Sequence, residues 1–128
     1  MQGILAFIRR WLPSISIMVT IFAFSSIPSY EMPNFAWADA LVKKGGHMLG
    51  YGLLAMAYLW GLRAERNDSK GNRAAARYAW LLAVLYACTD EFHQLFVAGR
   101  RASLVDVGMD ALGAGIAMAV WGWFSQRG

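Results

Sequence analysis

Long apolar runs divide this chain into four segments that are separated by short polar stretches. The runs cover about residues 11–28, 46–62, 75–97 and 104–124. A helix needs roughly 20 mostly apolar residues to cross a hydrocarbon core of about 30 Å. The third run turns polar after Cys88 and must continue to about Val97 to reach that length. The pattern predicts one all-α domain over residues 1–128, built as a four-helix transmembrane bundle.

Composition supports lipid rather than water as the surrounding solvent. Hydrophobic residues make up 58% of the chain and charged residues only 16%, whereas soluble domains carry about a quarter charged residues. The apolar content is too high for an intrinsically disordered chain, and a single cysteine cannot form the internal disulfides of a small disulfide-rich protein. The four spans leave only short connections between them, with no room for a separate soluble domain.

The distribution of basic residues predicts the orientation of the bundle. Cytoplasmic loops of membrane proteins are enriched in Lys and Arg, which also explains the net charge of +4 without a nucleic-acid partner. A cytoplasmic N-terminus places eight of the twelve basic residues on the inner side, namely Arg9, Arg10, Arg63, Arg66, Lys70, Arg73, Arg77 and Arg127. We therefore expect both termini in the cytoplasm.

Polar residues open the second span at its predicted outer end. Lys44, His47 and Tyr51 are spaced i, i+3, i+7, which places all three on one helical face. They form one side of a candidate site. The alternative is interfacial anchoring, in which Lys44 extends toward the head groups while His47 and Tyr51 hold the helix at the interface.

Ionisable residues also interrupt the third and fourth spans, in the same outer half. They are Asp90, Glu91, His93 and Gln94 in the third span, and Asp106 and Asp110, spaced i, i+4, in the fourth. Such residues cost at least about 2.5 kcal/mol each on insertion scales and usually face the bundle interior. The alternative reading is a salt bridge that only holds the helices together.

The segment between these spans offers a further cation. Gly99 permits a tight turn, from which Arg100 or Arg101 can reach back over the carboxylates. A guanidinium also suits a phosphate or carboxylate ligand. Three of the four spans and this segment thus direct polar groups to the extracytoplasmic half of the bundle.

These motifs resemble the VanZ-like family of small integral membrane proteins. The run from Thr89 to Arg100, followed by Asp106 and Asp110, is similar to the family signature D-E-x-x-Q-x-F-x-x-x-R with an acid six residues later and Asn or Asp four further on. Lys44 to Tyr51 resembles its K-x-x-H-x-x-x-Y element, and Phe24-Ser25-Ser26 its first-helix end. Ala98 stands where Pro is common, and Asp110 where Asn is frequent. The resemblance implies a four-helix protein of the bacterial cytoplasmic membrane, in a family named after a glycopeptide-resistance accessory protein.

The first functional hypothesis is an enzyme that acts at the outer leaflet on an anionic envelope lipid or lipid-linked cell-wall precursor. Lys44 and Arg100 would hold the head group, while His47 with Asp90 or Glu91 would act as general acid and base. The catalytic candidates are His47, Asp90, Glu91, Asp106 and Asp110. The candidates for substrate binding are Lys44, Tyr51, His93, Gln94 and Arg100.

Other readings of the same residues stay open. The protein can be an accessory protein that binds a lipid or glycopeptide-like ligand without transforming it. Intramembrane acids with His also suit a proton-coupled transporter, although four helices leave little room for alternating access. No cofactor is predicted. The His and carboxylate side chains are ligand types that suit Zn²⁺ or Mn²⁺, but their spacing matches no established metal motif.

Overall fold

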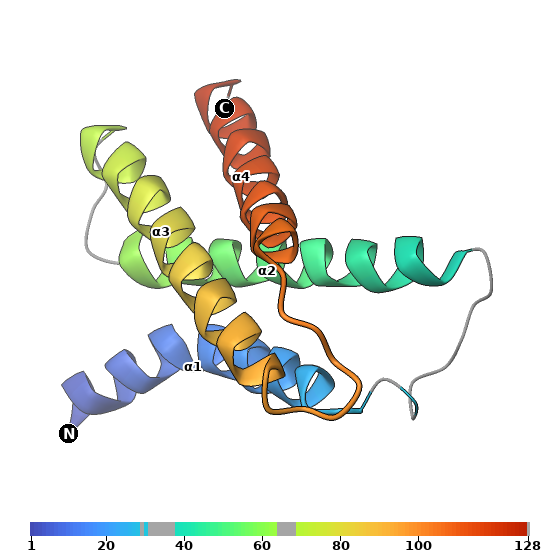
Figure 1. Cartoon of the computed structure of the whole chain (residues 1–128). Coiled ribbons are helices and arrows are strands. Elements are labelled where there is room, and N and C mark those ends of the chain that lie inside the picture. The colour runs from blue at the N-terminus through green and yellow to red at the C-terminus, as the bar shows by residue number, and fades with distance from the viewer. Residues whose placement is uncertain (29, 31–37, 64–68, 128) are drawn as a thin grey trace.

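The computed structural model describes residues 1–28, 30, 38–63 and 69–127 of the chain. Within these ranges the fold is all-helical, as predicted, with four helices: α1 (Gln2–Ser25), α2 (Asp39–Arg63), α3 (Ser69–Gln94) and α4 (Leu104–Arg127) (Figure 1). One of the basic residues used to orient the bundle, Arg66, lies outside the described residues.

The helix boundaries correct one prediction from the apolar pattern. α3 ends at Gln94 and does not continue to Val97. After it, the N–H groups of Leu95, Phe96 and Val97 bond to carbonyls only three residues back. Gly99 then adopts a positive φ of 73°, a conformation that favours glycine. The apolar residues at 95–97 therefore begin a turn, which directs the chain back toward α4.

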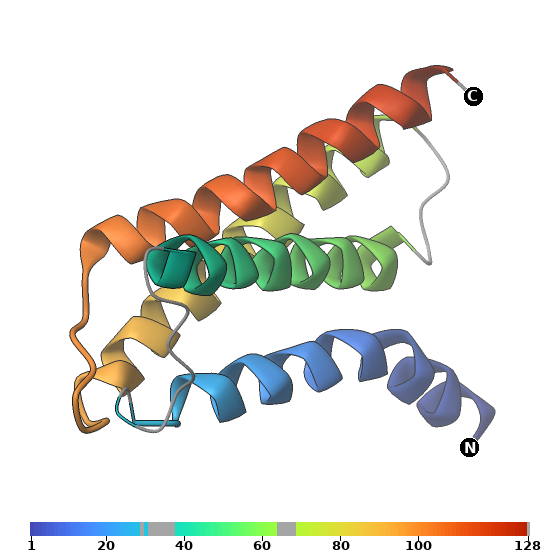
Figure 2. The same cartoon turned by 90° about the vertical axis from the view of Figure 1, so that its right-hand side faces the viewer.

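The four helices are arranged around α2. Figure 2 shows α2 between α4 on one side and α1 on the other, with α3 crossing behind. α1 makes more extensive contact with α2 than with α3. Figure 1 shows that α1 is bent, and the helix contains Pro13, a residue that commonly kinks helices. The tightest packing is therefore among α2, α3 and α4, with α1 laid against them.

A stripe of small residues forms the buried face of α3. Ala75, Ala79, Ala83 and Ala87 recur every four residues and are at most 3% exposed. Small side chains let neighbouring helices approach closely in membrane proteins. The same spacing leads from Ala87 to Glu91, so the stripe ends in a carboxyl group that lies between the helices.

Two glycines bring α2 and α4 into backbone contact. A Cβ built on Gly113 would lie 2.8 Å from the Cα of Met48, and one on Gly52 would lie 3.3 Å from the carbonyl oxygen of Gly113. Side chains larger than hydrogen would separate the helices at this point. The contact places the start of α2 against the first turns of α4.

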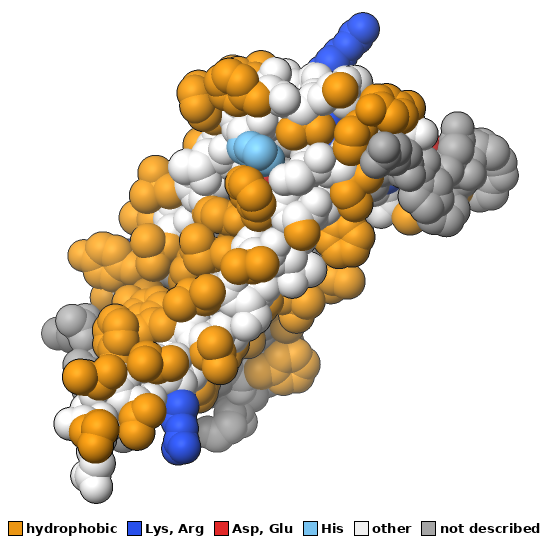
Figure 3. All heavy atoms as spheres, turned by 90° about the horizontal axis from the view of Figure 1, so that it is seen from below, with side chains coloured by type: hydrophobic (Ala, Val, Ile, Leu, Met, Phe, Trp, Pro, Cys, Tyr) orange, Lys and Arg blue, Asp and Glu red, His pale blue; other side chains and the backbone are white. Residues whose placement is uncertain are grey.

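The outer surface of the molecule is apolar. Large hydrophobic side chains are exposed along all four helices, including Phe7, Val19, Leu85 and Ile116, and Figure 3 shows them spread over one face, with Lys and Arg toward its ends. Two helical segments, Gln2–Ser25 and Leu104–Ser125, are long and apolar enough to cross a membrane, each with a mean hydropathy of 1.5. For α2 and α3, crossing the membrane stays a prediction.

Candidate functional site

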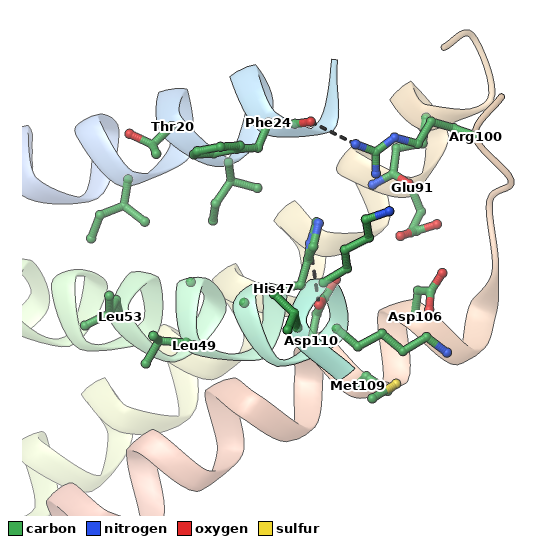
Figure 4. Close-up of a pocket in the computed structure, with 18 of the residues that line it drawn as sticks. Thr20, Phe24, His47, Leu49, Leu53, Glu91, Arg100, Asp106, Met109 and Asp110 are labelled. Carbon is green, nitrogen blue, oxygen red and sulfur yellow. Dashed lines mark hydrogen bonds and ion pairs between the residues drawn. The ribbon is translucent and has the colours of Figure 1, made fainter. Parts of the chain in front are cut away.

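A cavity of about 770 Å³ opens between α1 and α2 and reaches the end of α3 and the start of α4. Figure 4 shows Leu49 and Leu53 along one part of its wall, and His47, Glu91, Asp106, Asp110 and Arg100 together at the other. The remaining lining residues are Ser16, Ile17, Thr20, Ile21, Phe24, Val42, Lys43, Lys44, Gly46, Gly50, Gln94 and Met109. The cavity therefore has a charged end and an apolar slot.

His47 and Asp110 face each other across the contact between α2 and α4. Nδ1 of His47 lies 4.0 Å from Oδ1 of Asp110. The imidazole side chain is 28% exposed, whereas the carboxylate is only 3% exposed. His47 therefore presents its ring to the cavity, while Asp110 lies behind it and can orient it.

Asp90 lies deeper than the cavity wall. Its Oδ2 accepts hydrogen bonds from Ser25 Oγ at 2.9 Å and from Gln94 Nε2 at 3.2 Å. The side chain is buried, as is the whole of Tyr51. Asp90 thus joins α3 to the end of α1, and it is linked by a hydrogen bond to Gln94, which lines the cavity.

Three buried oxygens lie here: Asp110 Oδ2, which makes no hydrogen bond within the described residues, and Tyr51 Oη and Asp90 Oδ1, whose side chains interact with each other. All three belong to the polar residues that the sequence places inside the membrane. Buried polar atoms are normally paired, so unpaired ones concentrate at sites where a ligand, a water molecule or chemistry uses them. Their position beside the charged end makes this end of the cavity the candidate functional site.

Glu91 organises the start of α4. Its Oε2 accepts a hydrogen bond of 3.0 Å from the backbone N–H of Ser103, and Ser103 Oγ in turn accepts one of 3.1 Å from the N–H of Val105. The first N–H groups of a helix lack partners within the helix, so such contacts stabilise its beginning. Asp106 follows in the first turn of α4 and lines the cavity.

Arg100 holds the end of α1. Its Nε donates to the carbonyl oxygen of Ile27 at 3.1 Å, and its Nη2 donates to that of Phe24 at 3.0 Å (Figure 4). The last carbonyls of a helix lack partners within the helix and carry partial negative charge, which suits a guanidinium. Arg100 therefore lines the cavity and also fixes one of its walls.

His93 turns toward α1. Its Nε2 lies 2.9 Å from Ser26 Oγ, and its ring stacks on Phe22 with centroids 4.3 Å apart. Because this places the ring against α1, His93 is absent from the cavity lining. Seven of the ten predicted site residues line the cavity, Tyr51 and Asp90 lie buried behind it, and His93 binds α1 instead.

The proposed metal ligands do not assemble. Among the described residues, no three His, Cys, Asp or Glu side chains lie in a group that could hold a metal ion. Glu91 is directed to the start of α4, and His93 to α1.

Sequence reasoning missed how serines connect the site. Ser25 and Ser26 bind Asp90 and His93, and the N–H of Ser103 binds Glu91. The available signal was a pair of hydroxyls at the end of the first apolar run and one just before the last. Those positions, close to helix ends, favour side chains that bond to neighbouring elements.

Comparison with protein families gives one result for the whole chain. The model of the VanZ/LLP1 family matches residues 5–125. Neither the curated proteins nor the solved structures gave a significant match. The match includes α2 and α3, all but the outer ends of α1 and α4, and every residue of the cavity. The family resemblance of the sequence motifs is confirmed, and the chain belongs to the VanZ/LLP1 family.

Proposed function

We propose that the cavity binds an anionic amphiphile of the bacterial envelope, such as a phospholipid or a lipid-linked cell-wall precursor. The observation that carries this proposal is the two-part character of the cavity, which has charged residues at one end and an apolar slot between α1 and α2. Leu49 and Leu53 line this slot and are 66% and 53% exposed, so it opens on the apolar surface. A molecule with a polar head and an apolar tail matches both parts.

The cations at the charged end suit a phosphate head group. Lys43, Lys44 and Arg100 line the cavity. Lys43 pairs with Asp39 at 2.9 Å, and Arg100 is fixed by the end of α1. Lys44 is an exposed lysine at the cavity mouth. We therefore assign the first contact with the anionic head to Lys44.

The catalytic part of the proposal rests on His47 and Asp110. An imidazole at the cavity wall with a buried carboxylate behind it is an arrangement that serves a general base. His47 would accept a proton from a hydroxyl group of the head or from water, and Asp110 would orient the ring. Asp90 and Glu91, one of which was expected to act with His47 as general acid and base, bind the end of α1 and the start of α4 through hydrogen bonds.

The same proposal includes a topology. Four spans with both termini in the cytoplasm would place the charged end of the cavity at the outer leaflet of the cytoplasmic membrane. The two helices that are apolar enough to cross, together with the excess of basic residues at the opposite end, support it.

A second candidate is binding without transformation. The hydrogen bonds of Asp90, Glu91 and Arg100 favour it, because they give these residues a role in holding the cavity walls. Membership of the family is consistent with a membrane protein of the antibiotic-resistance type, and capture of an envelope lipid is sufficient for an accessory protein.

Lipids that co-purify with the full chain, identified by mass spectrometry, test both candidates. Lys44→Gln should lose the bound anionic lipid, whereas Arg101→Gln, which removes a neighbouring exposed cation outside the cavity, should retain it. His47→Gln should retain the lipid in an unmodified form that differs from the wild-type product. Identical lipids in wild type and His47→Gln would favour binding without transformation. Equal retention of lipid in Lys44→Gln and Arg101→Gln would contradict the proposed binding site.

A further inference from the structure

A second cavity lies at the opposite end of α1 and α2. It has a volume of about 370 Å³ and is lined by Ala6, Arg9, Arg10, Trp60 and Arg63. The first cavity starts at Ser16 on α1 and ends at Leu53 on α2, so the two share no residue. The second cavity is therefore separate from the polar cavity at the other end of these helices.

Trp11 and Gly61, each next in sequence to a residue that lines this second cavity, are in contact. A Cβ on Gly61 would lie 3.1 Å from the ring of Trp11, so the glycine lets the indole lie directly against α2. Pro13 follows two residues later in α1, and Figure 1 shows that this helix is bent. The two features bring Arg9 and Arg10 of α1 to the end of α2 that carries Arg63.

Arg63 is held in place before any ligand arrives. Its Nε donates to Asn72 Oδ1 at 3.0 Å, and its guanidinium carbon lies 4.9 Å from the centre of the Trp121 ring. Among the residues that the structure describes, three arginines and no carboxylate line the cavity. Planar guanidinium groups donate several hydrogen bonds in a fixed arrangement that matches phosphate oxygens.

The surroundings indicate a lipid rather than a soluble anion. Ile4, Phe7 and Ile8 stand exposed on the same turns of α1 as the arginines, and Trp60 is 56% exposed. Tryptophan is enriched at the level of lipid head groups, where its ring is partly apolar and its N–H is polar. Basic cavities between membrane helices are known sites for phosphate-bearing lipid heads.

We propose that this second cavity binds the phosphate head of an anionic membrane lipid, of the phosphatidylglycerol or cardiolipin class. Arg9 and Arg10 would clamp the phosphate from α1, and Arg63 from α2. The bound lipid would hold the bent first segment of α1 against α2. The inference does not rest on the function proposed for the polar cavity.

Native mass spectrometry of the purified full chain in detergent, with cardiolipin or phosphatidylcholine added, tests this proposal. Arg9→Gln/Arg10→Gln should weaken cardiolipin binding about tenfold or more, as expected when charge-assisted hydrogen bonds are removed. Arg73→Gln/Arg77→Gln is the matched control, because it removes two exposed arginines of α3 that do not line the cavity. We expect this control to bind cardiolipin as the wild type does.

Each other outcome would overturn the proposal. Equal losses in both double variants would show that only overall charge attracts the lipid. Unchanged binding in Arg9→Gln/Arg10→Gln would exclude the cavity. Equally tight binding of phosphatidylcholine would exclude recognition of the anionic head, and displacement of cardiolipin by millimolar inorganic phosphate would identify a free anion as the ligand.

Discussion

Nδ1 of His47 lies 4.0 Å from Oδ1 of Asp110, across the point where α2 meets α4. That short distance requires the two helices to lie close together, which a glycine in α4 allows. Gly113, three residues after Asp110, allows the backbone of α4 to rest on Met48, the residue that follows His47. The pair at the cavity wall is therefore a consequence of how closely two helices approach.

Gly113→Ala should separate the two helices. The added methyl would lie 2.8 Å from the Cα of Met48, and backbone cannot move aside as a flexible side chain can. We expect a loss of about 1–3 kcal/mol in the free energy of unfolding, the usual cost of overpacking. Denaturant titration in detergent measures this loss.

Gly108→Ala is the matched control for this variant. It lies in the same helix, and a Cβ there meets no atom within 4 Å. Alanine is the better helix former, so stability should be unchanged or higher by up to about 1 kcal/mol. Similar losses in both variants would mean that close contact at Gly113 is unimportant.

Ser25→Ala should destabilise the junction between α1 and α3. The variant removes the donor that lies 2.9 Å from Asp90 Oδ2 and leaves a buried carboxyl with only the 3.2 Å bond from Gln94. The expected cost is about 1–3 kcal/mol in the free energy of unfolding. Ser125→Ala, which removes an exposed bond to the Gly122 carbonyl, should change stability by less than about 0.5 kcal/mol.

A double-mutant cycle with Asp90→Ala, which removes the acceptor, separates the effect of this hydrogen bond from any general effect of the two substitutions. If Ser25 acts through Asp90, the two losses will not add, because both variants remove the same interaction. Strictly additive losses would argue against the bond.

Arg100→Ala should loosen the end of α1. Two of its N–H groups donate to the carbonyls of Phe24 and Ile27. Hydrogen–deuterium exchange of peptides that cover residues 20–28 should accelerate by about tenfold or more, since hydrogen bonds from charged groups are the stronger kind. Arg101→Ala removes an exposed neighbouring charge and should leave the exchange unchanged; acceleration in both variants would contradict this role.

The sequence predicted the four helices and the grouping of several polar residues that line one cavity. Apolar runs of spanning length define helices regardless of their neighbours, and i, i+3 or i, i+4 spacing puts residues such as Asp106 and Asp110 on one face. Both features are local, so they could be read without knowing how the helices pack. The four helices are found, and Lys44, His47, Asp106 and Asp110 line one cavity.

The partners of individual side chains could not be predicted in this way. His93 binds Ser26 and Phe22 because α1 lies against the end of α3, an arrangement that no spacing within either helix encodes. The direction of Arg100 depends on the turn at Gly99, where φ is 73°. Such contacts follow from tertiary packing and from turn geometry, which outweigh the helical pattern.

The proposed topology predicts the labelling of introduced cysteines. With Cys88→Ser as background, Asn67→Cys lies in the polar segment between the second and third helices, which the excess of basic residues assigns to the cytoplasm. A membrane-impermeant maleimide added to intact cells should leave it unlabelled, and Ala102→Cys, before α4, should react. The reverse pattern would invert the orientation and place the polar cavity at the inner leaflet.

Gly50→Leu should block the apolar slot without disturbing the charged end. Gly50 lines the cavity, and a Cβ there lies at an ordinary contact distance of 3.7 Å from Ile21. The rest of a leucine side chain would then occupy the space between α1 and α2 that we assign to the lipid tail. We expect roughly tenfold less co-purified lipid, the effect of an overpacking cost of about 1.4 kcal/mol on binding. Gly45→Leu, on the same helix but outside the cavity, has no atom within 4 Å of its Cβ and should retain the lipid. Full retention in Gly50→Leu, with unchanged stability, would mean that the tail lies elsewhere and that only the head group enters the cavity.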